Sequence, residues 1–345
     1  MTRKTVGVIA NPASGRDVRR LAARAGLSTV ESKRNQVMRA VIGAAAGGAE
    51  RIVIAKDPLR VSVGAVEGLA VEVDVEVIDA GGRYDASDTR RAAARMRELG
   101  CGALVVLGGD GTNRAIAQVW PDAPIVGIST GTNNAFPRMV EATSAGLAAG
   151  LVASGELSLA DVAVRSKIVR FAGEGEPDDL ALIDAVQLLD DAVGNLMPFD
   201  PERIRAVVLT RADPAGIGVS PLGGLLEPCA AEDDFGVLVR CTGHAGGGRA
   251  LLVPISPGLF RRVHVGEVRR LALGETVRID GGGVLALDGD REREILPGRA
   301  IELRVVREGP FAIDVTRALA AAARLGSMIE RPALRDGLGA LPGCC

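Results

Sequence analysis

The sequence has few aromatic residues and no surplus of charge of either sign. It contains six Phe, one Tyr and one Trp in 345 residues, and 41 basic side chains stand against 43 acidic ones, for a formal net charge of −2. Proteins that hold nucleic acid by its phosphates usually carry a basic surplus, and proteins that stack single strands need aromatic side chains. We therefore expect no nucleic-acid partner.

Long apolar runs are also missing. The longest bland stretch of small and apolar residues, 142–153, is too short and too weakly apolar to span a bilayer. Residues 1–4 lead directly into a strand-like apolar run, without the apolar core and cleavage site of a secretory signal peptide. We therefore expect a cytoplasmic protein with no membrane partner.

The five cysteines form neither a disulfide framework nor a zinc-binding pattern. Cys101, Cys229 and Cys241 are far apart in apolar surroundings, and Cys344 and Cys345 stand at the end of the sequence. This spacing suits a reducing compartment. The terminal pair could be a lipidation signal or part of a frayed tail.

The first part of the chain alternates short apolar runs with helical stretches, which is typical of a parallel sheet with crossover helices. We therefore predict a Rossmann-like α/β nucleotide-binding domain over residues 1–137. Its expected strands are 5–10, 51–55, 73–78, 103–107 and 124–128.

After a predicted helix near 140–154, the pattern changes to apolar runs rich in β-branched residues and separated by turn residues. We predict a β-rich, sandwich-like domain over 138–313, followed by a C-terminal helix and a loosely ordered tail over 314–345. The expected strands of the β-rich domain are 159–171, 181–189, 204–210, 236–241, 250–254, 276–280, 284–287 and 301–306, and the last helix is expected over 318–325.

Three turn motifs each follow a predicted strand, so all three are expected at the carboxyl edge of the sheet, where open α/β folds bind ligands. The first runs from Asn11 to Gly15 as Asn-Pro-Ala-Ser-Gly. Ser14 and Asp17 have the spacing of a capping box, and a helix N-terminus there would present backbone N–H groups to an anion. The motif could equally be a simple strand-to-helix turn.

The second motif, Gly-Gly-Asp-Gly-Thr from Gly108 to Thr112, is the most informative. Its glycines let the backbone approach a phosphate closely. Asp110 would repel a phosphate unless it binds a metal or accepts a proton from a hydroxyl. The alternative is a glycine-rich turn with a solvated Asp. The spacing matches neither a P-loop nor a dinucleotide fingerprint.

The third motif contains Gly131, Thr132, Asn133 and Asn134 after the strand predicted at 124–128. Asn side chains both donate and accept hydrogen bonds, which suits ribose hydroxyls or the edge of an adenine. Turn chemistry would also favour this composition.

Together the three motifs resemble those of the superfamily of NAD kinases and diacylglycerol kinase-like lipid kinases. Within it, residues 127–137, 219–228 and 285–292 are similar in particular to the NAD-kinase-like X proteins of acetoin-catabolism operons. The resemblance extends over most of the chain. It implies an α/β nucleotide-binding domain and a β-rich domain, with the active site in the cleft between them.

The resemblance also implies a chemistry. ATP and Mg²⁺, or another divalent cation, would serve a phosphoryl transfer to a hydroxyl group, with Asp110 as the catalytic residue that activates the hydroxyl. The glycines of the second motif and Thr112 would hold phosphates, and the two asparagines would hold the nucleoside. The full set of implied cofactor-binding residues is Asn11, Ser14, Gly15, Gly108, Gly109, Gly111, Thr112, Gly131, Thr132, Asn133 and Asn134.

The acceptor is less defined, because the sequence departs from both branches of the superfamily. NAD, converted to NADP, is the first candidate acceptor, although Ser220–Gly224 is poorer in hydroxyls than the corresponding loop of NAD kinases. Lipid kinases usually carry Asn-Glu where this chain has Asn113 and Arg114, which argues against a lipid. Another small hydroxylated metabolite, or an accessory nucleotide-binding role in acetoin catabolism without turnover, stays open. The phosphoryl donor could be ATP or polyphosphate.

A fourth segment places Asp288, Asp290 and Glu292 in a tight turn. Carboxylates at this spacing could share Mg²⁺ with ATP phosphates, and a similar segment contributes to the metal site of lipid kinases, so Asp288 is a candidate metal ligand. The alternative is a charged hairpin turn. Exposed strand edges in a β-rich domain also lead us to expect a homo-oligomer.

Overall fold

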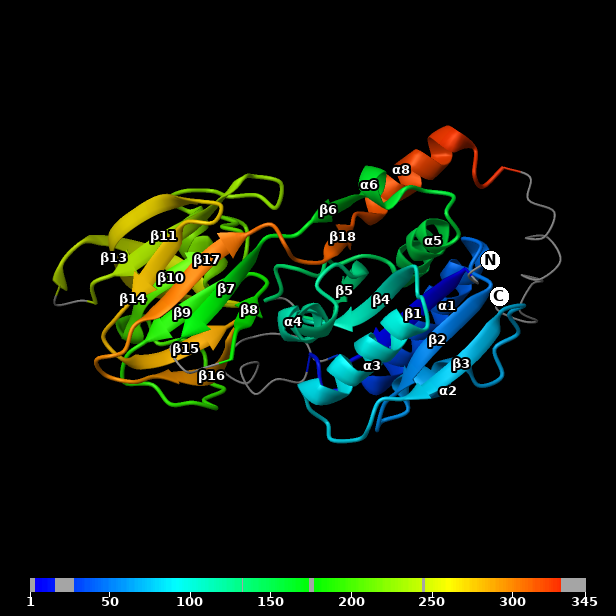
Figure 1. Cartoon of the computed structure of the whole chain (residues 1–345), viewed down its shortest axis with the longest axis horizontal. Helices are drawn as coiled ribbons and strands as arrows, with labels where there is room; N and C mark the ends of the chain where they lie inside the picture. The colour runs from blue at the N-terminus through cyan, green and yellow to red at the C-terminus, as the bar shows by residue number, and fades with distance from the viewer. Residues whose placement is uncertain (1–3, 16–27, 132, 174–176, 244–245, 330–345) are drawn as a thin grey trace.

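The computed structural model describes residues 4–15, 28–131, 133–173, 177–243 and 246–329. The chain forms an α/β body and a β-rich body that lie side by side, with helix α4 (Asp110–Val119) at the side of the α/β body that faces the β-rich one (Figure 1). This is the fold class that the sequence predicts, an α/β sheet domain followed by packed antiparallel sheets.

The first sheet has the strand order β3-β2-β1-β4-β5-β18-β6. The first six strands in this order run parallel, and β6 pairs antiparallel with β18. Because β1 to β5 are parallel, the turns that follow them meet at one edge of the sheet. The strands are β1 (Thr5–Ala10), β2 (Arg51–Lys56), β3 (Asp74–Asp79), β4 (Ala103–Gly108), β5 (Pro124–Ser129), β6 (Ala163–Arg165) and β18 (Phe311–Ile313).

Helices cover both faces of this sheet, and two of them pack unusually closely. Gly43 of α1 and Gly146 of α5 each lie against backbone of the other helix, so that a Cβ on either residue would overlap a carbonyl oxygen. None of the helices in the described part of the chain combines the length and hydropathy that a bilayer crossing requires. Besides α4, they are α1 (Val30–Ala46), α2 (Val61–Val66), α3 (Ala86–Glu98), α5 (Ala142–Ala153), α6 (Leu159–Val162), α7 (Ser220–Gly224) and α8 (Val315–Leu325), of which α7 lies in the β-rich body.

The β-rich body is a sandwich of two antiparallel sheets, with the orders β12-β13-β11-β10-β9-β15-β16 and β14-β17-β7-β8. Val169, Val208 and Val305 belong to the apolar layer buried between the sheets. The strands are β7 (Ile168–Gly173), β8 (Asp179–Ala181), β9 (Asp184–Leu188), β10 (Ile204–Leu209), β11 (Phe235–Cys241), β12 (Arg249–Ser256), β13 (Leu259–Ala272), β14 (Thr276–Ile279), β15 (Gly283–Leu287), β16 (Asp290–Ile295) and β17 (Ile301–Val306).

The strand predictions for this half were incomplete. The strand expected over 159–171 is divided into helix α6 and strands β6 and β7. Strands β13 and β16 were not predicted. In β13 arginines and a glutamate separate the buried apolar residues, and β16 contains a single apolar residue, Ile295, with Arg291 as its other buried residue. Charged side chains on the solvent face of a sheet commonly mask a strand in this way.

The chain enters the sandwich once, at β7, and returns to the first sheet at β18. Helix α5 packs on α1, and β18 pairs with β5, so residues 142–165 and 311–325 lie with the α/β body (Figure 1). The domain limits of 1–137, 138–313 and 314–345 stay a prediction.

Candidate active site

A cavity of about 940 Å³ opens at the carboxyl edge of the first sheet and continues to the sandwich. All three turn motifs reach it. Gly108 is not among its lining residues, and Thr132 lies outside the described part of the chain. The predicted site residues that line the cavity are Asn11, Ser14, Gly15, Gly109, Asp110, Gly111, Thr112, Gly131, Asn133, Asn134 and Asp288.

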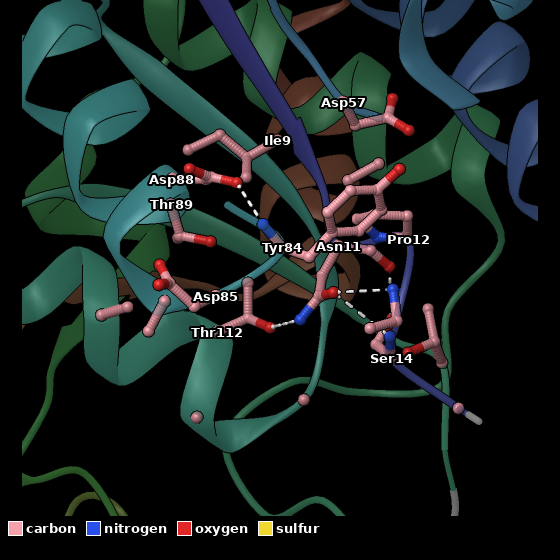
Figure 2. A pocket seen from close by; sticks show the side chains of 18 of the residues that line it. Ile9, Asn11, Pro12, Ser14, Asp57, Tyr84, Asp85, Asp88, Thr89 and Thr112 are labelled. Atoms are coloured by element: carbon pink, nitrogen blue, oxygen red, sulfur yellow. Dashed lines mark hydrogen bonds between the residues drawn. The ribbon is translucent and has the colours of Figure 1, made fainter. Parts of the chain in front are cut away.

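Asn11 connects the first turn to the second (Figure 2). Its Nδ2 donates to Oγ1 of Thr112 over 2.8 Å, and its Oδ1 accepts the backbone N–H groups of Ala13 and Ser14 at 2.9 and 3.2 Å. The Ser14 hydroxyl donates to the carbonyl of Asn11 over 2.8 Å. Asn11 therefore fixes both turns relative to each other. The expected capping partner Asp17 lies outside the described residues.

Lys33, on α1, stabilises this turn through its side chain. The sequence analysis did not predict it. It is completely buried on α1, and its Nζ donates to the carbonyls of Asn11, Pro12 and Ser14 at 2.9, 2.8 and 2.5 Å. An ammonium group is buried at low cost only when its donors are satisfied, as they are here. Its helical spacing from the apolar Val37 and Ala40 could have indicated a buried lysine.

The glycines of the second turn allow close contacts inside the protein. A Cβ on Gly109 would lie 2.8 Å from Oδ1 of Asn134, and one on Gly111 would lie 3.0 Å from Oδ2 of Asp290. Side chains at these positions would push the turn away from the neighbouring walls. Helix α4 begins immediately here, with Gly109 as N-cap, and its first N–H groups form a region of partial positive charge.

The carboxylate of Asp110 is held at the first turn of α4. Its oxygens accept the N–H groups of Phe136 at 2.8 Å and of Ala135 at 3.0 Å. Burial and the nearby Asp290 raise the pKa of Asp110, whereas the two N–H donors and Arg211 lower it, and the net pKa lies above the ordinary value. An aspartate with a raised pKa is a stronger proton acceptor than a solvated one.

Arg211, from the turn after β10, was also missed. Its guanidinium donates to the carbonyl of Ala135 over 3.1 Å and lies 5.6 Å from the ring centre of Phe136. Burial, together with repulsion from Arg138, lowers the pKa of Arg211 to about 10. It therefore brings a positive charge from the sandwich to the segment that positions Asp110.

The third turn divides its two asparagines between different roles. Asn134 donates to Oγ of Ser129 over 2.8 Å, and Ser129 donates to the carbonyl of Gly131 over 2.6 Å, so Asn134 maintains the shape of the turn. Asn133 is exposed and lines the cavity. Asn133 is thus better placed than Asn134 to contact a ligand.

Asp288 lies across the cavity on the β15–β16 hairpin. Asp288 and Gly289 both have positive φ angles, 50° and 86°, which is typical of a two-residue hairpin turn. The Asp288 carboxylate accepts the N–H groups of Leu182 and Ile183, each at 2.7 Å. Burial and the proximity of Asp110 raise the pKa of Asp288 to about 7. The segment is therefore a hairpin turn that also forms part of the cavity wall.

A magnesium site with Asp288 stays a prediction. Asp290 and Glu292 line the same cavity, yet no group of three or more His, Cys, Asp or Glu side chains within the described ranges could enclose a metal ion. Mg²⁺ usually binds to one or two carboxylates together with substrate phosphates, so a complete protein cage is not needed. The donor set at this wall fits that mode of binding.

Arg114, on α4 one turn beyond Asp110, joins the two bodies. Its guanidinium donates to Oδ2 of Asp179 at 2.8 Å, to the carbonyl of Leu180 at 2.7 Å and to Glu292 at 3.0 Å. Arg114 is 3% exposed. Arg114 stands where lipid kinases usually carry Glu. It makes an interdomain contact that helps to set the position of α4 beside the sandwich.

Tyr84, the single tyrosine of the chain, contributes an aromatic wall that the sequence analysis did not predict (Figure 2). It has a φ of 63°, an uncommon conformation for a bulky residue, and its N–H donates to Oδ2 of Asp88 over 2.9 Å. Its side chain is 61% exposed and lines the cavity. An exposed aromatic ring in a cavity wall can stack against a planar ligand.

The chain matches two family models. Residues 8–157 match the ATP-NAD kinase N-terminal domain, and residues 167–308 match the acetoin catabolism protein X C-terminal domain. The chain is also 37% identical over 274 residues to the acetoin catabolism protein X of Cupriavidus necator, an alignment that covers 75% of this chain and 76% of that protein. These matches confirm the resemblance indicated by the three motifs.

Solved structures of two other proteins are more distant. A putative diacylglycerol kinase from Bacillus anthracis is 11% identical with a TM-score of 0.49, over 91% of this chain and 99% of its own. An NAD kinase from Archaeoglobus fulgidus in complex with ATP is 16% identical with a TM-score of 0.38, over 81% of this chain and 99% of its own. Likenesses this distant carry no inference about function.

Proposed function

Since the chain belongs to the acetoin catabolism protein X family and contains an N-terminal domain of the ATP-NAD kinase type, we propose that it transfers a phosphoryl group from ATP to a hydroxyl group. The observation that carries this proposal is the position of Asp110. Its carboxylate is held by two backbone N–H groups at the start of α4, in a cavity large enough for a nucleotide.

In the proposed reaction, the ATP phosphates lie against the Gly109–Thr112 turn, where backbone N–H groups and the start of α4 favour negative charge. Asp110 accepts the proton of the acceptor hydroxyl. The hydroxyl oxygen then forms a bond to the γ-phosphorus, and the bond between that phosphorus and the β–γ bridging oxygen breaks, releasing ADP. The protein contributes mainly by positioning and by compensating charge.

Other residues of the cavity have supporting roles in this proposal. Asn11 and Lys33 hold the first turn, Asn133 contacts the nucleoside, and the ring of Tyr84 borders the same space. Asp288 would share a Mg²⁺ ion with the phosphates. When bound, that ion would neutralise part of the phosphate charge.

NAD remains one candidate acceptor, and polyphosphate remains an alternative donor. Both are tested by supplying purified protein and Mg²⁺ with ATP or polyphosphate, with and without NAD, and measuring NADP with a coupled dehydrogenase. The cytoplasmic location and the homo-oligomer stay predictions of the sequence.

The proposal is tested by Asp110→Asn, with the exposed Asp122→Asn as matched control. Loss of a general base lowers turnover by roughly 10²- to 10⁴-fold, while ATP affinity should change little because the backbone of the turn is retained. Asp122 lies in the loop before β5, at the opposite end of that strand, and its variant should behave like the wild type.

The result against the proposal would be equal ATP turnover in Asp110→Asn and the wild type. ATP binding by calorimetry without any turnover, in the presence of NAD or of small hydroxylated compounds, would instead favour the accessory nucleotide-binding role. The presence or absence of turnover therefore distinguishes phosphoryl transfer from the accessory nucleotide-binding role. The Asp110 variant tests whether Asp110 acts as the base.

A further inference from the structure

A second, smaller cavity lies on the other side of Asp110. Its volume is about 90 Å³, and it shares Asp110, Asn133 and Asp288 with the large cavity. The Asp110 carboxylate thus borders both spaces. A base that accepts a proton from one substrate during transfer from another must lie where the two substrates meet.

The walls of the small cavity come mostly from the sandwich and are mostly uncharged. Apolar side chains line it from three separate segments of the chain, the loop before β10, the loop before α7, and strand β12. They include Met197, Pro198, Phe199, Ile217, Val219 and Ile255. Polar groups contribute about as much of the lining as these apolar side chains do, so the cavity offers hydrogen-bond partners as well as apolar contacts to a small organic molecule.

The charges around this cavity disfavour an anionic acceptor. Three carboxylates border it, Asp110, Asp184 and Asp288. Among the described lining residues Arg291 is the single basic one, and its buried guanidinium pairs with the equally buried Asp191 at 2.8 Å. Carboxylates therefore outnumber basic side chains in this lining, with Arg211 lying beyond it on the carbonyl of Ala135, and the excess of acidic groups disfavours a phosphate-bearing acceptor such as a dinucleotide.

The rim of the cavity is fixed by hydrogen bonds. Arg291 donates to the carbonyls of Asn195 and Met197 at 2.7 and 2.9 Å, and its guanidinium lies 4.7 Å from the ring centre of Phe199. Ser220 accepts the N–H of Asp213 at 2.9 Å, which anchors the loop before α7. Because both loops are anchored, the size of the cavity can select its ligand.

We propose that this small cavity is the acceptor subsite, and that it takes a neutral, hydroxylated molecule of roughly four to six non-hydrogen atoms. By comparison with a cavity of ~150 Å³, which accommodates the six carbons of benzene, the small cavity holds about four non-hydrogen atoms. The upper figure of six applies to a molecule that extends into the large cavity, which shares Asp110, Asn133 and Asp288 with the small one. The proposal rests on the phosphotransferase function above. It replaces NAD with a small alcohol, polyol or hydroxyketone as the acceptor.

The test is a size series of acceptors with Mg²⁺ and ATP: ethane-1,2-diol, glycerol, acetoin, erythritol and sorbitol, with NAD beside them. ADP is measured by a coupled assay and the phosphate ester by ³¹P NMR. We expect kcat/KM for the best of the first three to exceed that for sorbitol by at least about tenfold, the order that a misfit of a few heavy atoms produces.

Two wall variants connect the size preference to this cavity. Phe199→Ala should enlarge the cavity and raise kcat/KM for erythritol and sorbitol relative to glycerol by about tenfold, with unchanged ATP affinity. Ile217→Ala should act in the same direction and serves if the first variant does not fold. Phe260→Ala, on β13 outside the cavity lining and with its side chain 54% exposed, should keep the wild-type preference.

Three outcomes would count against the proposal in different ways. NADP formation faster than phosphorylation of any small compound would overturn the small acceptor and leave the phosphotransferase function intact. An unchanged size preference in both wall variants would overturn the assignment of this cavity. ATP binding without ADP formation for every acceptor would reject the proposed function itself, and the acceptor subsite with it.

Discussion

Replacing Arg114 with Met should destabilise the protein more than replacing an exposed arginine with Met does. The side chains of Arg114 and Asp179 are 4% and 8% exposed, and their charges are compensated by each other. Removing one partner of a buried ion pair typically costs about 3–5 kcal/mol, because the remaining charge stays buried.

The neighbours of Asp179 narrow the expected loss in the free energy of unfolding. Without Arg114, its carboxylate keeps Arg293 at 3.0 Å and Gln118 at 2.8 Å, so part of the compensation remains. The carbonyl of Leu180 also loses its donor from Arg114. We therefore expect a loss of about 3 kcal/mol in the free energy of unfolding, at the lower end of the range for broken buried pairs.

Urea denaturation measures this loss, and the chain contains a suitable reporter. Trp120, the single tryptophan, is 7% exposed and directly follows α4, the helix that carries Arg114. At a slope of about 3 kcal/mol/M, the urea midpoint should fall by about 1 M. Far-UV circular dichroism should show the same shift if both bodies unfold together.

The matched control is Arg95→Met. Arg95 pairs with Glu98 at 2.9 Å on the surface, where the side chains are 53% and 65% exposed. Exposed pairs contribute about 0–1 kcal/mol, so the control midpoint should stay close to that of the wild type. Equal shifts for Arg114→Met and Arg95→Met would refute the argument that burial makes the interdomain pair important.

Two further predictions concern packing and acidity. Gly146→Ala should lower the free energy of unfolding by about 1–3 kcal/mol, because its Cβ would overlap the carbonyl oxygen of Ala40 between α5 and α1, whereas Gly82→Ala, with open space around it, should change thermal stability little. Burial alone would raise the pKa of Asp179, but Arg114 and further hydrogen-bond donors bring it below the ordinary value. Its contribution to stability is therefore complete above the unfolded-state pKa of about 3.9 and is lost as pH falls through the lower folded-state pKa, so the difference between the urea midpoints of the wild type and Asp179→Asn should shrink as the pH is lowered below about 3.9.

Part of the site could be predicted from sequence because its geometry is local. A parallel sheet brings the turns after β1, β4 and β5 to one edge, and each of these strands was recognisable as an apolar run. Asp110 stood out because a carboxylate inside a glycine-rich turn is chemically unusual. The three motifs therefore predicted the sheet, the edge and the central residue of the candidate site.

Contacts between distant segments left no comparable pattern. Arg114 meets its partners 65 and 178 positions later, and Arg211, in the turn after β10, reaches the segment after β5. Such pairs depend on how the two bodies are placed against each other, which short-range periodicity does not encode. The same reason explains why β18 was missed, since its three residues become a strand only by pairing with β5 and β6.

The sequence by itself determined the alternation of strands β1 to β5 with helices, the glycine-rich turns that follow these strands, and the unusual carboxylate of Asp110 within one of them. Tertiary structure decided which groups surround that carboxylate and how much room lies beyond it. The small cavity is formed by loops of the sandwich that close on the edge of the sheet, and its volume depends on side-chain packing across the two bodies. Packing of this kind is a property of the whole fold, because each wall residue is positioned by contacts made far away in the chain.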